Sequence, residues 1–117
     1  MTALLGLDIG TQSTKAVVTD GALVPRGEAS VAYRPRFPQP GWAEQDPGDW
    51  MRALGPAIAG ALAQVGLSPG AIAAIGVVGQ LDGCVAVDGA GRPLAPALLW
   101  MDRRAATLLR RITLDDI

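Results

Sequence analysis

The first nineteen residues restrict the fold more than any other part of the chain. The apolar run Ala3–Leu7 predicts a strand that is buried on both faces, and Thr14–Thr19 is rich in the β-branched residues that favour strands. Between them lies a short acidic turn that begins at Asp8. A chain of 117 residues forms one domain at most. The sequence therefore predicts that this strand pair lies at the centre of a single small lobe.

More strands are expected beside this pair. Asp20-Gly21 is a short hairpin signal, and residues 23–33 supply a third strand, so the chain opens with an antiparallel three-strand meander. The apolar segment Ile72–Val78 predicts another buried strand. Together with the helices below, this pattern predicts an α/β lobe with a mixed sheet.

One long helix is expected between these strands. Asp46 is a suitable N-cap, Pro47 suits the first helical position, and Gly66 suits the C-terminal cap. Pro56 predicts a kink inside the helix. The apolar residues that recur at helical spacing and should face the sheet are Trp50, Leu54, Ala57, Ile58, Ala61, Leu62 and Val65.

The last third of the chain is less regular. Residues 84–87 and 94–100 flank a turn at 88–91 and predict a β-hairpin, although Pro93 and Pro96 restrict its second arm to short pairing. Asp102 is expected to cap a final helix that runs through Ile112. Residues 113–117 carry no structural prediction.

Composition excludes several kinds of partner. The net charge is −1 and the basic residues form no stripe, so nucleic acid is not expected to bind. No segment approaches the roughly 20 apolar residues that a membrane span needs. Cys84 is the single cysteine, which excludes an internal disulfide and fits a reducing compartment. We expect a soluble cytoplasmic protein.

The acidic turn has residues suited to phosphate and magnesium. Asp8 ends a buried strand, where a carboxylate needs a cation or hydrogen-bond donors. Gly10 allows close backbone approach to a phosphate, and Thr11 and Ser13 offer hydroxyl donors. Lys15 could reach a terminal phosphate. The alternative is an ordinary hairpin turn stabilised by aspartate, with Lys15 as a solvated strand lysine.

Four segments in this order carry a family resemblance. They are Asp8-Ile9-Gly10-Thr11, Gly41-Trp42-Ala43-Glu44-Gln45-Asp46-Pro47, Gly79-Gln80-Leu81-Asp82-Gly83 and Leu99-Trp100-Met101-Asp102-Arg103-Arg104. On these segments the chain resembles the N-terminal portion of the FGGY carbohydrate kinases, most closely their xylulokinase-like members, from residue 3 to about residue 106.

The resemblance implies a fold and an activity. The fold is one lobe of the actin-like ATPase and ribonuclease-H type, and residues 1–117 are the N-terminal part of that lobe, with the rest of it and the C-terminal lobe absent. The activity is transfer of the ATP γ-phosphate to a hydroxyl of a sugar or polyol, with Mg²⁺. By similarity, Asp8 is the catalytic and metal-binding residue and Thr11 lies near the nucleotide phosphates. From their chemistry, Gly10, Ser13 and Lys15 are the other candidate phosphate contacts. The family's catalytic base lies beyond residue 117.

The resemblance also implies a substrate site. Gln80, Leu81 and Asp82 match the family's sugar-contacting loop, and Trp100 matches an aromatic residue of the sugar pocket. Asp102 is a further candidate contact. Each has a structural alternative: Asp82 belongs to a turn, Trp100 to the core, and Asp102 to a helix cap. Trp42, Glu44 and Asp46 are expected to be structural.

One departure bears on the substrate. Xylulokinases carry Met-His-Gly where this chain has Leu81-Asp82-Gly83. A carboxylate is a stronger acceptor than an imidazole and carries a fixed charge, so the recognised hydroxyl pattern can differ from that of D-xylulose. A xylulose-like ketose is the first expectation.

Two other classes of function stay open. The chain could be a non-catalytic sugar- or partner-binding module that retains half of a kinase site. It could also belong to an actin-like or chaperone-type ATPase, although the segments at residues 41–47 and 100–104 argue against that. An unfinished sheet edge predicts marginal stability or a homodimer.

Overall fold

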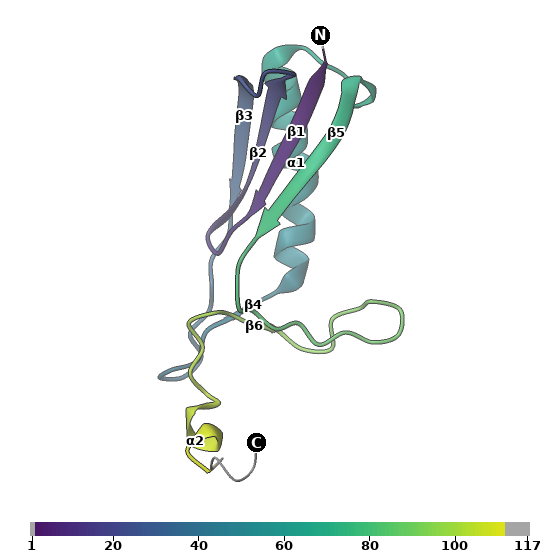
Figure 1. Cartoon of the computed structure of the whole chain (residues 1–117). Helices are drawn as coiled ribbons and strands as arrows, with labels where there is room; N and C mark the ends of the chain where they lie inside the picture. The colour runs from purple at the N-terminus through teal and green to yellow at the C-terminus, as the bar shows by residue number, and fades with distance from the viewer. Residues whose placement is uncertain (1, 112–117) are drawn as a thin grey trace.

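The computed structural model describes residues 2–111, which form an elongated body of 58 × 29 × 28 Å (Figure 1). Its radius of gyration is 18.1 Å. A compact domain of this length would have a radius of gyration of about 13 Å. The sheet and its helix lie at one end, and the later loops extend away from them. The described residues therefore do not close around a single compact core.

The main sheet has four strands in the order β3-β2-β1-β5. The strands β1 (Ala3–Ile9), β2 (Ser13–Asp20) and β3 (Pro25–Ala32) pair antiparallel, which confirms the predicted meander. The strand β5 (Ile72–Gly79) pairs parallel with β1. Asp8 lies opposite Lys15 on one side and opposite Val78 on the other. The sheet is mixed, as the sequence predicts.

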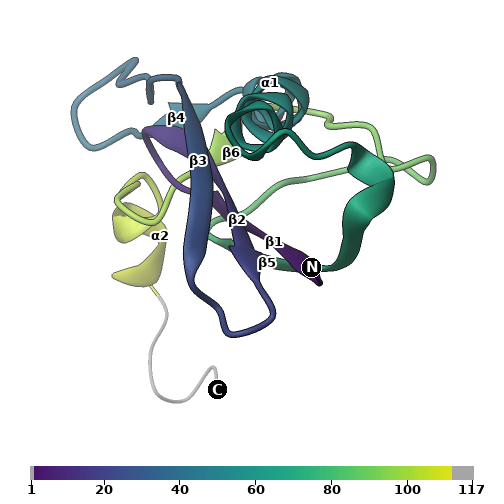
Figure 2. The same ribbon diagram turned by 90° about the horizontal axis from the view of Figure 1, so that it is seen from above.

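The helix α1 (Pro47–Val65) covers one face of the sheet and packs against β2 and β3 (Figure 2). Asp46 accepts a hydrogen bond from Gly48 N at its start, and Gly66 ends it in a left-handed conformation with φ of 64°, so both predicted caps are confirmed. The helix continues through Pro56 as one element. The core that it closes consists of Ala3, Leu5, Leu7, Ala16, Val18, Ala57, Ala61 and Leu62.

The remaining elements are short. They are the two-residue strands β4 (Glu44–Gln45) and β6 (Ala97–Leu98), which pair antiparallel, the 3₁₀ turn η1 (Pro69–Ala71), and α2 (Ala106–Leu109). The expected hairpin exists only as isolated bridges, Cys84 with Leu98 and Val87 with Pro93. Its second arm pairs with β4 instead. Within residues 2–111, no helix has the length and hydropathy required to cross a membrane.

Three expectations need correction. The strand β5 is not buried: Ile75, Val77 and Val78 are 59%, 60% and 63% exposed, because α1 lies over β2 and β3 and nothing described covers β5. The turn after Asp20 is longer than a two-residue hairpin, and Leu23 takes the left-handed conformation there. The last helix begins at Ala106 rather than at Asp102, and its expected end at Ile112 lies outside the described residues.

Close approach between α1 and β3 depends on glycine. A Cβ on Gly60 would lie 2.8 Å from Ala29 Cβ, whereas a Cβ on Gly55 of the same helix meets nothing within 4 Å. We expect Gly60→Ala to lower the free energy of unfolding by about 1–3 kcal/mol through overpacking. We expect Gly55→Ala to change it by less than about 1 kcal/mol, because the gain in helix propensity is offset by crowding of the new Cβ against the ring of Pro56. Urea titration of both variants measures this, and equal losses in both would contradict it.

The open edge of β5 predicts self-association. The strand has one paired neighbour among the described residues, carries no charge and exposes apolar side chains, which are features of strands that add to another sheet. We expect sedimentation equilibrium of the chain to show concentration-dependent dimers, and Val77→Lys to shift them toward monomer. Met51→Lys, at a position on α1 that is 70% exposed, is the matched control. A wild-type chain that stays monomeric would refute this expectation.

Candidate functional site

Most of the predicted site residues meet where two parallel strands end. The C-terminal ends of β1 and β5 lie side by side, and the loop after each strand borders a hollow of about 390 Å³. Carboxyl ends of neighbouring parallel strands are a common place for ligand sites in α/β folds. The residues that line this hollow are Asp8, Gly10, Thr11, Gly79, Gln80, Leu81, Asp82 and Trp100.

Asp8 lies at the wall of this hollow and is exposed. Strand alternation places it on the sheet face away from α1, since Leu5 and Leu7 are in the core. Lys15, its register partner on β2, shares that face and is also exposed. Ser13, at the start of β2, shares it too. Lys15 and Ser13 therefore flank the Asp8 side of the site without lining the hollow itself.

Thr11 joins the acidic turn to the other predicted residues. Its Oγ1 donates to Gln80 Oε1 at 3.2 Å and accepts from Trp100 Nε1 at 3.3 Å. These contacts span 69 and 89 residues of sequence. The turn after β1, the loop after β5 and the segment after β6 are thus fixed relative to one another through one hydroxyl.

The backbone of the turn after β1 is held by hydrogen bonds from side chains. Gly10 O accepts hydrogen bonds from Tyr33 Oη at 2.8 Å and from Gln80 Nε2 at 3.1 Å. Tyr33 Oη also lies 3.1 Å from Thr14 Oγ1, which is fully buried. Burial raises the pKa of Tyr33, so its hydroxyl stays protonated and remains a donor to Gly10. These hydrogen bonds therefore fix the conformation of the turn.

The loop after β5 presents side chains to the hollow. Asp82 takes the left-handed conformation with φ of 54°, which aspartate tolerates better than most residues, and its side chain is exposed. Leu81 is 79% exposed. Trp100 is 51% exposed, so it is a wall of the hollow rather than a core residue. Carboxylate, amide and indole groups thus face one space.

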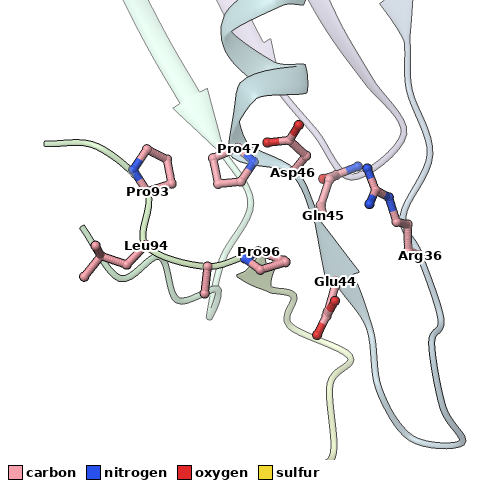
Figure 3. Close-up of a pocket in the computed structure, with 9 residues that line it drawn as sticks. Arg36, Glu44, Gln45, Asp46, Pro47, Pro93, Leu94 and Pro96 are labelled. Atoms are coloured by element: carbon pink, nitrogen blue, oxygen red, sulfur yellow. The ribbon is translucent and has the colours of Figure 1, made fainter. Parts of the chain in front are cut away.

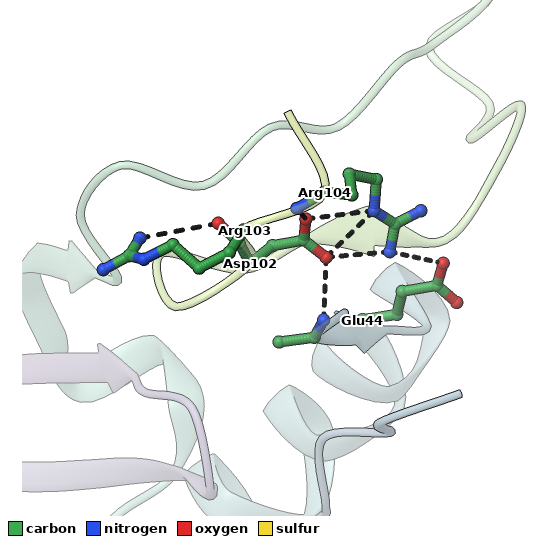
Figure 4. Close-up of polar contacts among 5 residues, drawn as sticks. Glu44, Asp102, Arg103 and Arg104 are labelled. Atoms are coloured by element: carbon green, nitrogen blue, oxygen red, sulfur yellow. Dashed lines mark hydrogen bonds and ion pairs between the residues drawn. The ribbon is translucent and has the colours of Figure 1, made fainter. Parts of the chain in front are cut away.

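Asp102 lies outside this hollow and does not begin a helix. Its carboxylate accepts from Ala43 N at 2.7 Å and from Arg104, whose guanidinium also contacts Glu44 at 2.8 Å (Figure 4). The same guanidinium stacks over Trp42 at 3.7 Å from the ring centroid. This cluster fastens the segment after β6 to the segment before β4. Asp102 is therefore a structural anchor two residues from Trp100.

Sequence reasoning missed three residues that support the site. Gln45 is completely buried and bonds to the turn after β1, Tyr33 braces Gly10, and Arg104 holds Asp102 and Glu44. For Gln45, the one available sequence signal is its position: it lies among charged residues just before the proline at which an apolar helix begins. The partners Gly10 of Tyr33 and Glu44 of Arg104 lie 23 and 60 residues away in sequence, too far to be inferred.

Two other hollows lie nearby. One, of about 260 Å³, lies between β4 and the loop at residues 93–96, with Arg36 and Asp46 on one side and Pro93 and Pro96 on the other (Figure 3). It contains none of the predicted site residues. The second, of about 310 Å³, shares Gln80 and Asp82 with the main hollow and continues over Trp50.

The side chains available as metal ligands indicate how the predicted Mg²⁺ could bind. Within residues 2–111 no three His, Cys, Asp or Glu side chains are grouped closely enough to hold an ion by themselves. Mg²⁺ is commonly held by one or two carboxylates together with substrate phosphates and water. Asp8, exposed at the hollow beside backbone and hydroxyl groups of the turn, fits that mode of binding and does not fit an all-protein metal cage.

Comparison with known proteins defines the class. Residues 3–116 match the N-terminal domain of the FGGY family of carbohydrate kinases, and the chain belongs to this family. A glycerol kinase from Methylibium petroleiphilum is 43% identical over 113 residues, which cover 95% of the chain and 22% of that relative. A glycerol kinase from Aromatoleum aromaticum is 36% identical over 96% of the chain and 23% of its own length.

Solved structures give the same fold. A structure described as a xyloylose kinase from Brucella ovis matches with a TM-score of 0.83 and 40% identity, covering 91% of the chain and 23% of that protein. A xylulose kinase from Rhodospirillum rubrum matches with a TM-score of 0.82 and 28% identity, covering 97% and 24%. The predicted actin-like lobe is confirmed. The chain spans less than a quarter of the length of these relatives.

The Asp102 cluster predicts a pH-dependent stability. The Arg104 guanidinium holds the pKa of Asp102 well below its usual 3.8. A lowered folded-state pKa adds stability that is complete above the unfolded value and is lost as the pH falls toward the folded value. We expect Asp102→Asn to lower the melting temperature at neutral pH, and the difference from wild type to shrink below about pH 4.

The control for this prediction is Glu28→Gln, which removes an exposed carboxylate on β3 that has no ion pair among the described residues. It should leave the melting temperature almost unchanged from neutral to acid pH. If Asp102→Asn shows the same difference from wild type at every pH, the ion cluster does not contribute in the way proposed here.

Proposed function

We propose that the polypeptide that includes this chain is an ATP-dependent carbohydrate kinase. It would transfer the γ-phosphate of ATP to a hydroxyl of a small sugar or polyol. The observation that carries this proposal is the joint placement of Asp8 and the loop at residues 80–82 around one hollow, in a chain of the FGGY family. One side of the hollow suits phosphates, and the other suits hydroxyl groups.

The phosphate side consists of the turn after β1. Phosphoryl transfer depends mainly on alignment of the reactants and on neutralisation of charge, with little covalent chemistry from the protein. Asp8 would hold Mg²⁺, which supplies positive charge to the phosphate oxygens when bound. Gly10 would allow close approach of the phosphates and Thr11 would offer its backbone N–H, while Ser13 and Lys15 would lie beside the phosphates on the same sheet face.

The acceptor side consists of Gln80, Asp82 and Trp100. The carboxylate of Asp82 can accept bonds from neighbouring hydroxyls, and the exposed indole of Trp100 offers an apolar face to C–H groups. Leu81 adds apolar surface at the rim. Asp102 is removed from this set, because its carboxylate is occupied by Arg104 and Ala43.

A xylulose-like ketose is the first candidate acceptor and glycerol is the second. The structural relatives from Brucella ovis and Rhodospirillum rubrum are described as xylulose-type kinases, which supports the ketose. The 43% identity to the Methylibium petroleiphilum glycerol kinase supports glycerol. Both acceptors carry adjacent hydroxyl groups, which the carboxylate of Asp82 could bind. Such a kinase would act in the cytoplasm, where ATP is present.

A non-catalytic module is the alternative. Residues 1–117 contain no residue to which a general base can be assigned by similarity, so this chain by itself would bind without turnover. Sugar or polyol binding by a polypeptide that lacks ATP-dependent turnover would favour that alternative.

The test is sugar-dependent ADP release. We expect turnover from the polypeptide encoded by the complete reading frame and none from residues 1–117 alone. We expect Asp8→Asn in the complete polypeptide to lower kcat by roughly 10²-fold or more, because the phosphates lose their alignment. Asp49→Asn, on α1 and paired with the exposed Arg52, is the matched control.

A panel of D-xylulose, ribulose, xylitol, gluconate and glycerol then identifies the acceptor by kcat/KM. Sugar-dependent turnover by residues 1–117 alone would overturn the proposed division of the site between this chain and the rest of the protein. Sugar-independent ATP hydrolysis by the complete polypeptide would favour the actin-like or chaperone-type ATPase instead.

A further inference from the structure

Gln45 is the most deeply buried large polar side chain among the described residues, with no exposed surface. A buried amide without partners costs about 1–3 kcal/mol in proteins, so its contacts need an explanation. Gln45 lies on β4, two residues before α1 begins, and belongs neither to the phosphate turn nor to the sugar loop. Its amide nevertheless connects both.

Three hydrogen bonds converge on this amide. Its Nε2 donates to Thr11 O at 2.9 Å. Its Oε1 accepts from Trp50 Nε1 at 2.7 Å and from Gln80 Nε2 at 3.2 Å. The indole of α1 fixes the amide, and the amide then fixes the turn after β1 and the loop after β5. An amide suits this position because its donor and its acceptor lie on one planar group.

The bond to Thr11 has a consequence for the opposite side of the turn. In a trans peptide the N–H points away from the C=O of the same unit. With Thr11 O held by Gln45 and Gly10 O held by Tyr33 and Gln80, the N–H groups of Gln12 and Thr11 are directed away from these side chains. Neither N–H has an acceptor within residues 2–111. Oriented backbone N–H groups form anion-binding sites.

We propose that Gln45 is a positioning residue that orients the backbone N–H groups of the β1–β2 turn toward phosphate and links that turn to Gln80 of the sugar loop. This inference rests on the proposed function. It adds that phosphate alignment depends on a residue that touches neither substrate, and that the two halves of the site are coupled through one amide.

The first experiment measures kcat and KM of Gln45→Glu in the complete polypeptide. The introduced carboxylate still accepts from Trp50 but opposes Thr11 O with a second acceptor. We expect kcat to fall roughly 10-fold or more at about pH 8, as for other supporting partners of a site, with a smaller change in sugar KM. Protonation of this buried carboxyl restores an O–H donor, so the deficit should shrink as the pH falls toward about 6.

The matched control is Gln64→Glu. Gln64 Nε2 also donates to a backbone carbonyl, Glu28 O, and its Oε1 accepts from Glu28 N, but it lies on the exposed side of α1. The chemical change is the same and the location differs. Gln64→Glu should leave kcat and its pH profile as in wild type. A pH-independent loss in Gln45→Glu, or equal losses in both variants, would overturn the proposal.

A second measurement does not depend on turnover. In the isotopically labelled 117-residue chain, the carbonyl carbon resonance of Thr11 reports its hydrogen bond. We expect Gln45→Glu to shift this resonance, with a pH titration that follows the introduced carboxyl, and Gln64→Glu to leave it in place. An unshifted resonance refutes the inference. A shifted resonance in a protein without sugar-dependent turnover refutes the proposed function alone.

Discussion

The hydrogen bond from Gln45 to the carbonyl of Thr11 is the contact on which the geometry of the site depends. The sheet and α1 would form a small layered core without it, because Leu5, Val18 and Ala57 pack regardless of what lies at the strand ends. At the strand ends, side-chain hydrogen bonds connect the turn after β1 to the loop after β5 and to β4. A buried amide with fixed partners has little freedom to rearrange, so it sets the position of the turn after β1 more firmly than a surface contact could.

The second constraint is that the site needs a residue from late in the chain, Trp100, to lie beside the turn after β1. Trp100 reaches Thr11 only because the segment after β6 is held against the segment before β4 by Arg104, Asp102 and Glu44. The Arg104 cluster and the Gln45 amide lie on opposite sides of the same short β4–β6 pairing. Two residues of pairing would be weak alone. The ion cluster and the amide together make that pairing specific.

The sequence predicts the sheet, α1 and its caps well, because those depend on local patterns such as Asp46-Pro47 and the glycine at residue 66. It also predicts that Asp8, Thr11, Gln80 and Trp100 belong to one site, although through a family resemblance rather than through spacing. Prediction from the sequence fails for features that depend on packing between residues far apart in the chain. β5 is exposed because α1 lies over other strands of the sheet. The carboxylate of Asp102 pairs with Arg104 instead of capping a helix, because a charged donor is the stronger partner.

The open side of β5 and the hollow at its end are connected features. The same parallel pairing with β1 that brings Gln80 beside Gly10 leaves Ile75 and Val77 without cover among the described residues. A polypeptide segment that covered β5 would stiffen the strand from which the sugar loop departs, and through Gln80 and Gln45 it would stiffen the phosphate turn as well. Completion of the sheet and alignment of the two substrates would then be one process rather than two.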